Sequence, residues 1–429
     1  MRSSVNTRQS RKEAAGGPGG RKRIILILLL AIIIVAGVFA FPIIEAWIVG
    51  DRTETPFEPA EPYLPDAVSA VDISIVCVGD IMVHKSQIAS QYDSSTGTFN
   101  YDNNFQYVKK YIETSDLALC NVETTFAGGT PTGYPSFNAP DALAKSLADA
   151  GFDVGLTSNN HLYDKGLSGL KRTLRVLRNE GIATAGTRLP WERNYVLMNV
   201  KGVKTAIISY TYETPSNGGR STINGVILPE GTKELVNSFN YEILDDDLKK
   251  VESTIASARE NGADIIVCYY HWGEEYQRGP NPWQEYIAEK TVEMGADVIF
   301  ASHPHVLQRV DILKHKETGK DVPVFYSMGN FLSNQRAETL NNRYTEQGMI
   351  ARVNLKYDMD KGEVTLVGAD SMNTWLDKYR SGGRDVYAIV PLDEDLEDNE
   401  ALKASGHLHR AVQASSDVEA VIGSDYIWE

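Results

Sequence analysis

Histidines, carboxylates and two asparagines follow several apolar segments of the sequence, each time near the point where the segment ends. The residues in this group are Asp80, His84, Asn121, Glu123, Asn160, His161, His271, His303 and His305. Carboxylate oxygens, an amide oxygen and imidazole nitrogens together suit borderline divalent metals such as Mn, Fe or Zn. No stretch has the closely spaced cysteines of a structural zinc site. The residue types therefore predict a metal site of mixed oxygen and nitrogen ligands.

The elements that position these residues alternate between helical and strand-like patterns. Helices are predicted over residues 141–151, 166–181, 245–262 and 282–295, and each leads into an apolar strand. This alternation predicts an α/β fold in which helices cover both faces of the sheet. Such folds build their sites at the carboxyl ends of the strands, so we expect His161, His271 and the pair His303/His305 to lie there.

Six segments, taken in order, resemble the CapA family, which is named for poly-γ-glutamate capsule synthesis and is itself similar to the calcineurin-like metallophosphoesterases. The segments are GDIM, NVE, SNNHLYDKG, HWG, SHPHV and YSMGNF. The resemblance covers roughly residues 73–335 and is specific as an ordered set. It implies a metallophosphoesterase-like four-layered α/β/β/α sandwich over residues 71–392, in which two sheets carry the loops of the site.

The same resemblance implies two divalent metal ions (Mn, Fe or Zn). Their ligands would be Asp80, Glu123, Asn160, His271, His303 and His305. Glu123 matches the bridging carboxylate, Asp80 and His305 would serve the first metal, and the others the second. Because side chains alternate along a strand, His303 and His305 would point the same way and face the two metals, with Pro304 stiffening their turn.

His161 and Asp164 are the catalytic residues that the resemblance implies. His161 matches the histidine that faces substrate in phosphoesterases, where it would stabilise charge on a phosphoryl group or protonate the leaving oxygen. Asp164 would orient the His161 ring. Arg309 is either a further phosphate contact or a surface arginine without that role.

Two motifs depart from the phosphoesterase pattern. Met82 occupies the position of the histidine in the Asp-x-His motif, and a thioether is a poor ligand for hard divalent metals. His84 lies two residues further on and is a candidate replacement. The segment NVE stands in place of Gly-Asp-x-x-Asp. Hydrolysis therefore does not follow from the fold alone.

The first 70 residues predict a membrane anchor. A basic tail, residues 1–23, precedes an uncharged apolar run over residues 24–44, which is long enough to span a bilayer. Since every basic residue within residues 1–50 precedes the run, the N-terminus is expected in the cytoplasm and the main domain outside, as a single-pass cell-membrane protein. A cleaved signal peptide is the alternative. Residues 45–70 contain prolines at every third position from Pro56 to Pro65 and predict an extended spacer.

The charge of the chain argues against a nucleic-acid partner. The formal net charge is −15, and residues 1–50 contribute +5, which leaves −20 on the remainder. Non-specific binding to nucleic acid relies on clustered lysine and arginine, and an acidic domain would need metal ions or a local basic pocket to hold any polyanion.

Two further features have simple structural interpretations. Cys77, Cys120 and Cys268 all lie in apolar runs and are expected to be buried thiols, although an odd number in an exported protein also allows an intermolecular disulfide. Residues 393–429 form an acidic, helical extension in which we find no chemistry, and residues 348–372 predict a β-hairpin.

Three functions follow as hypotheses. The first is a component of poly-γ-glutamate synthesis or export that works with membrane-bound synthase or export subunits on an anionic polymer, and the resemblance favours it. The second is an extracytoplasmic metallophosphoesterase that acts on an envelope or nucleotide phosphoester. The third is a catalytically degenerate scaffold of the same fold, which Met82 favours.

Overall fold

The computed structural model describes residues 69–428. The predicted cytoplasmic tail, the apolar run over residues 24–44 and all but the last two residues of the spacer lie outside the described residues. None of the helices within residues 69–428 has the length and apolar character needed to cross a membrane.

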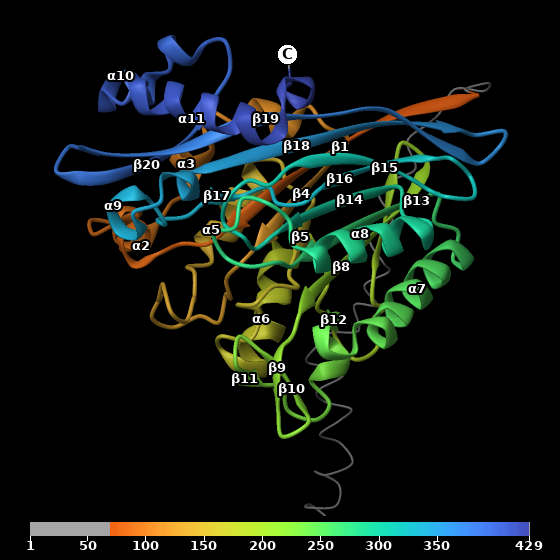
Figure 1. Ribbon diagram of the computed structural model, residues 1–429. Coiled ribbons are helices and arrows are strands. Elements are labelled where there is room, and N and C mark those ends of the chain that lie inside the picture. Colours follow the sequence, from red (N-terminus) through yellow and green to blue (C-terminus); the bar gives the residue numbers. More distant parts are fainter. Residues whose placement is uncertain (1–68, 429) are drawn as a thin grey trace, which may run out of the picture. The chain divides into compact units, whose positions relative to one another are not determined.

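Two large mixed β-sheets organise the described part of the chain (Figure 1). The first has the order β20 (Arg384–Pro391), β19 (Glu363–Ser381), β18 (Gln347–Asp358), β1 (Ala70–Ile81), β4 (Leu117–Val122), β5 (Val154–Leu156) and β6 (Ala183–Ala185), with β17 (Asn330–Leu332) also paired to β1. The second has the order β12 (Ser238–Phe239), β8 (Val203–Tyr212), β13 (Ile265–His271), β14 (Val298–Ser302), β16 (Asp321–Phe325) and β15 (Val310–Lys314), with β7 (Val196–Val200) paired to β8. The predicted hairpin is confirmed as the antiparallel pair β18 and β19.

The two sheets pack face to face through their apolar side chains. Ile75 and Cys77 of β1 belong to the same buried cluster as Val267 of β13 and Phe300 of β14. Strands β1 and β4 run parallel and end at the same edge of the first sheet, and β13 and β14 do so in the second. The predicted site residues lie at or just after the carboxyl ends of these strands.

Helices cover the outer faces of both sheets, which confirms the predicted α/β fold. The outer face of the first sheet packs against α2 (Lys85–Ser90), α3 (Asp102–Phe105), α4 (Lys109–Glu113), α5 (Ala142–Asp149) and α6 (Gly166–Asn179). The outer face of the second sheet packs against α7 (Leu244–Glu260) and α8 (Pro282–Glu293), which lie side by side (Figure 1).

The helices begin and end where local sequence signals predict. Three aspartates fill the first turn of α7, where carboxylates interact favourably with the helix dipole, and Gly262 follows the helix with φ +85°. Asn281 caps α8 by accepting a hydrogen bond from Gln284 N, and Pro282 occupies the first helical position. After these helices the chain enters the next core strand, β13 after α7 and β14 after α8.

Small elements complete the described chain. They are the hairpin of β2 (Tyr92–Asp93) and β3 (Thr98–Phe99), the small sheet of β9 (Thr214–Asn217), β10 (Arg220–Ile223) and β11 (Val226–Ile227), and the helices α9 (Ala337–Leu340), α10 (Glu400–Ser405) and α11 (Leu408–Ile422). Apolar residues of α10 and α11 join the same core cluster as Trp375 of β19. The acidic C-terminal segment is therefore packed against the first sheet.

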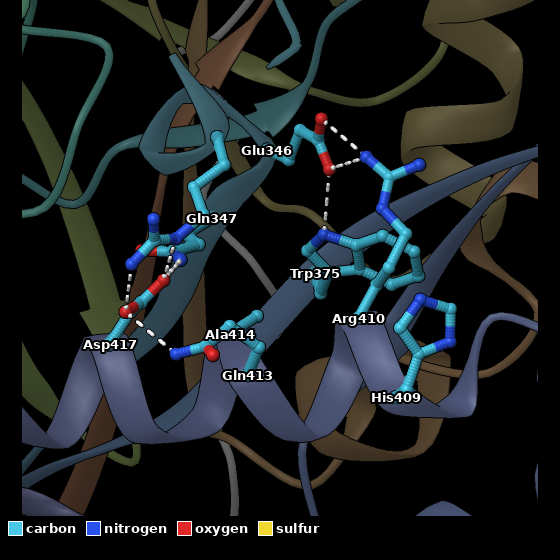
Figure 2. A pocket seen from close by; sticks show the side chains of 9 residues that line it. Glu346, Gln347, Trp375, His409, Arg410, Gln413, Ala414 and Asp417 are labelled. Atoms are coloured by element: carbon cyan, nitrogen blue, oxygen red, sulfur yellow. Dashed lines mark hydrogen bonds and ion pairs between the residues drawn. The ribbon is translucent and has the colours of Figure 1, made fainter.

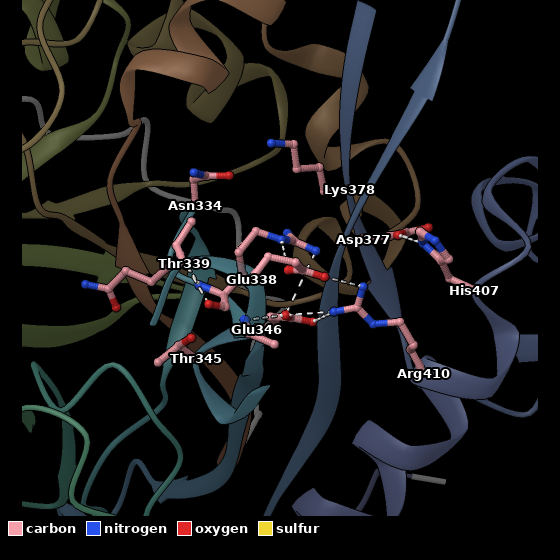
Figure 3. A network of polar contacts seen from close by, with 12 residues as sticks. Asn334, Glu338, Thr339, Thr345, Glu346, Asp377, Lys378, His407 and Arg410 are labelled. Carbon is pink, nitrogen blue, oxygen red and sulfur yellow. Dashed lines mark hydrogen bonds and ion pairs between the residues drawn. The ribbon is translucent and has the colours of Figure 1, made fainter. Parts of the chain in front are cut away.

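Ion pairs hold α11 in place around a cavity of about 210 Å³ (Figure 2). Arg343 donates to both carboxylate oxygens of Asp417, and Arg410 donates to the buried Glu346, which also accepts from Trp375 Nε1 at 3.0 Å. Figure 3 shows the same network continuing to Glu338. Since each of these arginines is paired with a carboxylate of the protein, we interpret the cavity as part of a structural junction.

Candidate metal centre

The predicted ligands from both sheets meet at the shared edge. Asp80 is the next-to-last residue of β1, Glu123 follows β4, and His271 ends β13. His303 and His305 follow β14, and all five side chains are at most 3% exposed. The packing of the two sheets therefore brings together residues that lie far apart in the sequence.

Glu123 lies at the middle of this group and has no hydrogen bond within the described residues at either carboxylate oxygen. Its Oε1 is 3.6 Å from His271 Nε2 and 3.9 Å from His305 Nε2. Burial raises the pKa of Glu123, and the nearby Asp80 raises it further. An unpaired buried carboxylate is costly, so the site fits a bound cation.

Two overlapping sets of donor atoms share Glu123. One consists of Glu123, His303 and His305, and the other of Asp80, Glu123 and His271. Within each set, all donor atoms lie within 4.8 Å of one another. His303 Nδ1 is buried and has no partner in the described residues, and burial lowers the pKa values of His271 and His303. Metal ligation needs neutral imidazoles, so these histidines fit that role.

Asp80 contacts the His305 ring and also belongs to the set of donor atoms that contains Glu123 and His271. Its Oδ2 is 2.9 Å from His305 Nδ1, and its Oδ1 accepts a hydrogen bond from Asn121 Nδ2 at 2.8 Å. With Nδ1 engaged, His305 presents Nε2 toward Glu123. A carboxylate paired with the far nitrogen of a histidine is a common way to orient a metal ligand.

Asn330 is a site residue that the sequence analysis missed. Its Oδ1 is 3.2 Å from His305 Nδ1, and its Nδ2 donates to Thr345 O at 2.9 Å and to Gln335 Oε1 at 3.1 Å. The available signal was a polar residue at the start of the apolar strand β17. Asn330 therefore helps Asp80 to fix the His305 ring at Nδ1.

Asn160 lies where a ligand beside His271 was predicted. Its Oδ1 is 3.1 Å from His271 Nε2. The preceding Asn159 donates from Nδ2 to Val122 O at 2.8 Å and accepts from His161 N at 3.1 Å. The loop that carries Asn160 and His161 is thus tied to the end of β4.

The turn that carries His303 and His305 differs from the strand geometry expected for it. Strand β14 ends at Ser302, and His303 and His305 have φ values of +108° and +58°. The explanation from strand alternation is therefore wrong, because two residues with positive φ aim the rings. Such angles are strained for residues with a side chain, and Tyr276 N donates to Pro304 O at 2.7 Å to hold the turn.

His161 and Asp164 lie together as predicted. His161 Nδ1 is 2.9 Å from Asp164 Oδ2, which also accepts a hydrogen bond from Phe137 N at 2.6 Å. The Phe137 ring packs edge-on against His161, with ring centroids 4.7 Å apart. Phe137 was not singled out from the sequence, and it helps to fix both predicted catalytic residues.

Three other residues that the sequence analysis raised have the following positions. Met82 is buried, and its N–H donates to Leu332 O, while His84 lies outside both sets of donor atoms found in the described residues. Arg309 pairs with Glu285 and Asp311 and lies over the Tyr326 ring, which agrees with the surface alternative.

The three cysteines are buried free thiols, as expected. Burial raises the pKa of each thiol, so none is a ready nucleophile or metal ligand.

Comparisons with known proteins agree with the ordered motifs. The chain is 32% identical over 273 residues to capsule biosynthesis protein CapA of Bacillus anthracis, a match that spans 61% of this chain and 60% of that relative's length. It is 27% identical over 314 residues to PGA biosynthesis protein CapA of Bacillus subtilis, covering 70% of this chain and 72% of that protein. A phosphatase structure from Mycoplasma pneumoniae aligns with a TM-score of 0.40 at 13% identity, covering 71% of this chain and 93% of that one.

The family model described as bacterial capsule synthesis protein PGA_cap matches residues 74–335, a range that contains every candidate ligand and the His161–Asp164 pair. The chain therefore belongs to the bacterial capsule synthesis family PGA_cap.

Proposed function

We propose that this chain is an accessory protein of poly-γ-glutamate synthesis or export that binds two divalent metal ions and acts on a phosphoester outside the cell. Family membership supports the first part of the proposal. The apolar run over residues 24–44 supports a membrane anchor. An anchored protein would interact with membrane-bound synthase or export subunits.

The metal-binding part rests on one observation, which is the unpaired, fully buried carboxylate of Glu123 among three histidines. Glu123 would be common to both ions. His303 and His305 would hold one side of the pair, and Asp80 and His271, with Asn160 beside His271, would hold the other. When bound, two such ions supply positive charge that stabilises a phosphoryl group during displacement.

The chain's own residues account for orientation and proton transfer. Asp164 engages Nδ1 of His161 and leaves Nε2 as the nitrogen that exchanges a proton with substrate. Phe137 fixes the Asp164 carboxylate through its backbone N–H. The side chains of Asp80 and Asn330 both contact Nδ1 of His305 and so fix that ring.

Elemental mass spectrometry of the purified full-length protein tests metal binding. We expect two divalent ions per chain in the wild type and a clear loss in Glu123→Ala and His303→Ala variants. Lys249→Ala, at an exposed ion pair on α7, is a control that should keep both ions. A wild type without metal after supplementation would contradict the proposal.

A complementation experiment tests the role in capsule synthesis. Native host cells that lack this protein should recover surface poly-γ-glutamate when they receive the wild-type gene. The Glu123→Ala gene should fail to restore the polymer although the protein reaches the membrane. Normal polymer in the deletion strain would refute the capsule role and leave a general phosphoesterase as the remaining candidate.

A further inference from the structure

The side chain of Asn121 contacts two members of the candidate metal centre. Asn121 is fully buried in β4, and the neighbouring residue across the parallel register on β1 is Asp80. Its Nδ2 donates to Asp80 Oδ1 at 2.8 Å and lies 3.4 Å from His271 Nδ1. Asp80 and His271 form one set of donor atoms with Glu123. One amide group therefore contacts two of the three members of that set, although they come from different sheets.

A second buried amide, that of Asn159, holds Asn121 from the other end. Asn159 Nδ2 lies 3.2 Å from Asn121 Oδ1 and donates to Val122 O at 2.8 Å. Asn159 Oδ1 accepts a hydrogen bond from His161 N at 3.1 Å. A backbone carbonyl can only accept and a backbone N–H can only donate, so these two contacts fix which end of the Asn159 amide is the nitrogen.

The orientation of Asn159 in turn fixes that of Asn121. Because Asn159 presents an N–H group to Asn121, the atom that receives it is the Asn121 oxygen. The Asn121 nitrogen then faces the carboxylate of Asp80, which accepts hydrogen bonds. The reversed amide would place oxygen against oxygen at Asp80 and nitrogen against nitrogen at Asn159. Asn121 therefore turns N–H groups toward the donor set, and an amide nitrogen is not a metal ligand.

We propose that Asn121 is a positioning residue that holds Asp80 and His271 in place for a metal ion, and that Asn159 acts on these two ligands through Asn121. This inference rests on the proposed function, since it concerns the ligands of that metal site. The hydrogen bond from His161 N to Asn159 extends the same connection to the loop of the predicted catalytic histidine. The two asparagines therefore couple that loop to the metal ligands.

A double-mutant cycle of metal affinity tests this coupling. Asn121→Leu and Asn159→Leu each remove one amide and keep a side chain of similar size, and a third protein carries both changes. Co²⁺ is the probe, and competition with a metal-sensitive dye measures its affinity for the full-length protein. The visible absorption spectrum of bound Co²⁺ reports the arrangement of its ligands, which a loss of stability alone would leave unchanged.

Asn104→Leu is the matched control. Asn104 is also buried, and its Nδ2 donates to Tyr387 O at 2.6 Å, but it lies in α3 on the outer face of the first sheet. The control therefore loses a buried amide hydrogen bond at a place where no candidate ligand lies. Circular dichroism checks that each variant is folded, and urea unfolding measures its stability.

We expect Asn121→Leu to bind Co²⁺ about 10- to 100-fold more weakly than the wild type, as is typical for the loss of a group that orients a ligand, and to change the Co²⁺ spectrum. Asn159→Leu should also weaken binding. The double variant should bind about as weakly as Asn121→Leu alone, because Asn159 acts through Asn121 and the two effects are not additive. Asn104→Leu should lose stability and keep the wild-type Co²⁺ affinity and spectrum.

Two results would overturn the inference while the metal site stands. Equal Co²⁺ affinities and spectra for Asn121→Leu and Asn104→Leu would make Asn121 a structural residue only. Additive effects in the double variant would mean that Asn159 acts through its neighbour Asn160 and not through Asn121. If Asn121→Leu does not fold, Asn159→Leu decides, since wild-type affinity there would refute the coupling. A wild type that binds no Co²⁺ refutes the proposed metal site itself, so the two failures are distinguishable.

Discussion

The carboxylate of Asp80 lies 2.9 Å from Nδ1 of His305, although 225 positions separate the two residues in the chain. Asp80 belongs to β1 of the first sheet, and His305 follows β14 of the second. The contact therefore exists only when both sheets are packed together. A metal that binds this site binds the folded chain and not the unfolded one, so metal binding and stability are coupled.

Metal removal is expected to lower the thermal stability of the protein. A ligand that binds only the folded state at about 100 times its Kd contributes about 2.7 kcal/mol. Thermal unfolding of the full-length protein, with and without a chelator, measures this difference. The Glu123→Gln variant serves as control, because it should bind metal weakly and respond little to the chelator. An identical chelator effect in both proteins would argue against Glu123 as the shared ligand.

Asn330→Ala is expected to weaken metal binding about 10- to 100-fold, as is typical for the loss of a group that orients a ligand. The reason is that Asn330 Oδ1 contacts His305 Nδ1 while its Nδ2 is anchored to Thr345 O. Asn330→Asp keeps an oxygen at that position and should be less affected. Competition with a metal-sensitive dye measures the affinity, and Asn261→Ala at the exposed end of α7 is the control. Equal affinities for Asn330→Ala and Asn261→Ala would rule out the positioning role.

Asp164→Asn is expected to lower the turnover of an artificial phosphodiester, such as bis-p-nitrophenyl phosphate, by about 100-fold. The Asp164 carboxylate holds His161 through Nδ1, and an amide supports a charged imidazole less well. Metal content should stay at the wild-type value, which separates this effect from ligand loss. Unchanged turnover with unchanged metal would show that His161 acts without Asp164 or not at all.

Glu346→Gln is expected to destabilise the protein by about 2–3 kcal/mol, because it breaks a largely buried charge pair. Glu346 is 2% exposed and accepts from Arg410 Nη2 at 2.8 Å and from Trp375 Nε1 at 3.0 Å (Figure 2). Urea unfolding measures the change. Asp246→Asn removes an exposed ion pair to Lys249 and should change stability by less than about 1 kcal/mol. Equal effects would mean that Glu346 does not anchor α11.

Acid is expected to destabilise the metal-free protein as pH falls below about 6.5. Burial lowers the pKa of His84 to about 4 from the ordinary value of 6.5, so the unfolded chain binds this proton first. The contribution of His84 to the free energy of unfolding is therefore fully present above pH 6.5 and is lost as the pH falls toward 4. His271 and His303 act in the same direction, since burial also lowers their pKa values.

The pH experiment needs a variant background, because burial raises the pKa of Glu123 and gives this group the opposite sign. Thermal unfolding of metal-free Glu123→Gln protein between pH 7.5 and 4 isolates the histidines. Adding His84→Gln to that background should make the loss of stability shallower. The same slope with and without His84 would contradict its assignment as a buried neutral ring.

The sequence predicted the repeated helix–strand units closely because short-range patterns specify them. The helix expected over residues 245–262 is α7 (Leu244–Glu260), and that expected over 282–295 is α8 (Pro282–Glu293). Strand-end residues such as His271 were found because polar residues mark the end of an apolar run. Strand alternation failed for His303 and His305, since positive φ values in a turn leave no periodic signal.

By itself the sequence determined the family, the α/β pattern and the residue types of the candidate metal site, since ordered motifs and local periodicity carry that information. Only the tertiary structure decided that Asn330 contacts His305, that Phe137 contacts both His84 and His161, and that Arg309 pairs with Glu285. These contacts join segments from different elements. Their partners are set by the packing of two sheets against each other, and no pattern within a single segment encodes which side chains that packing brings together.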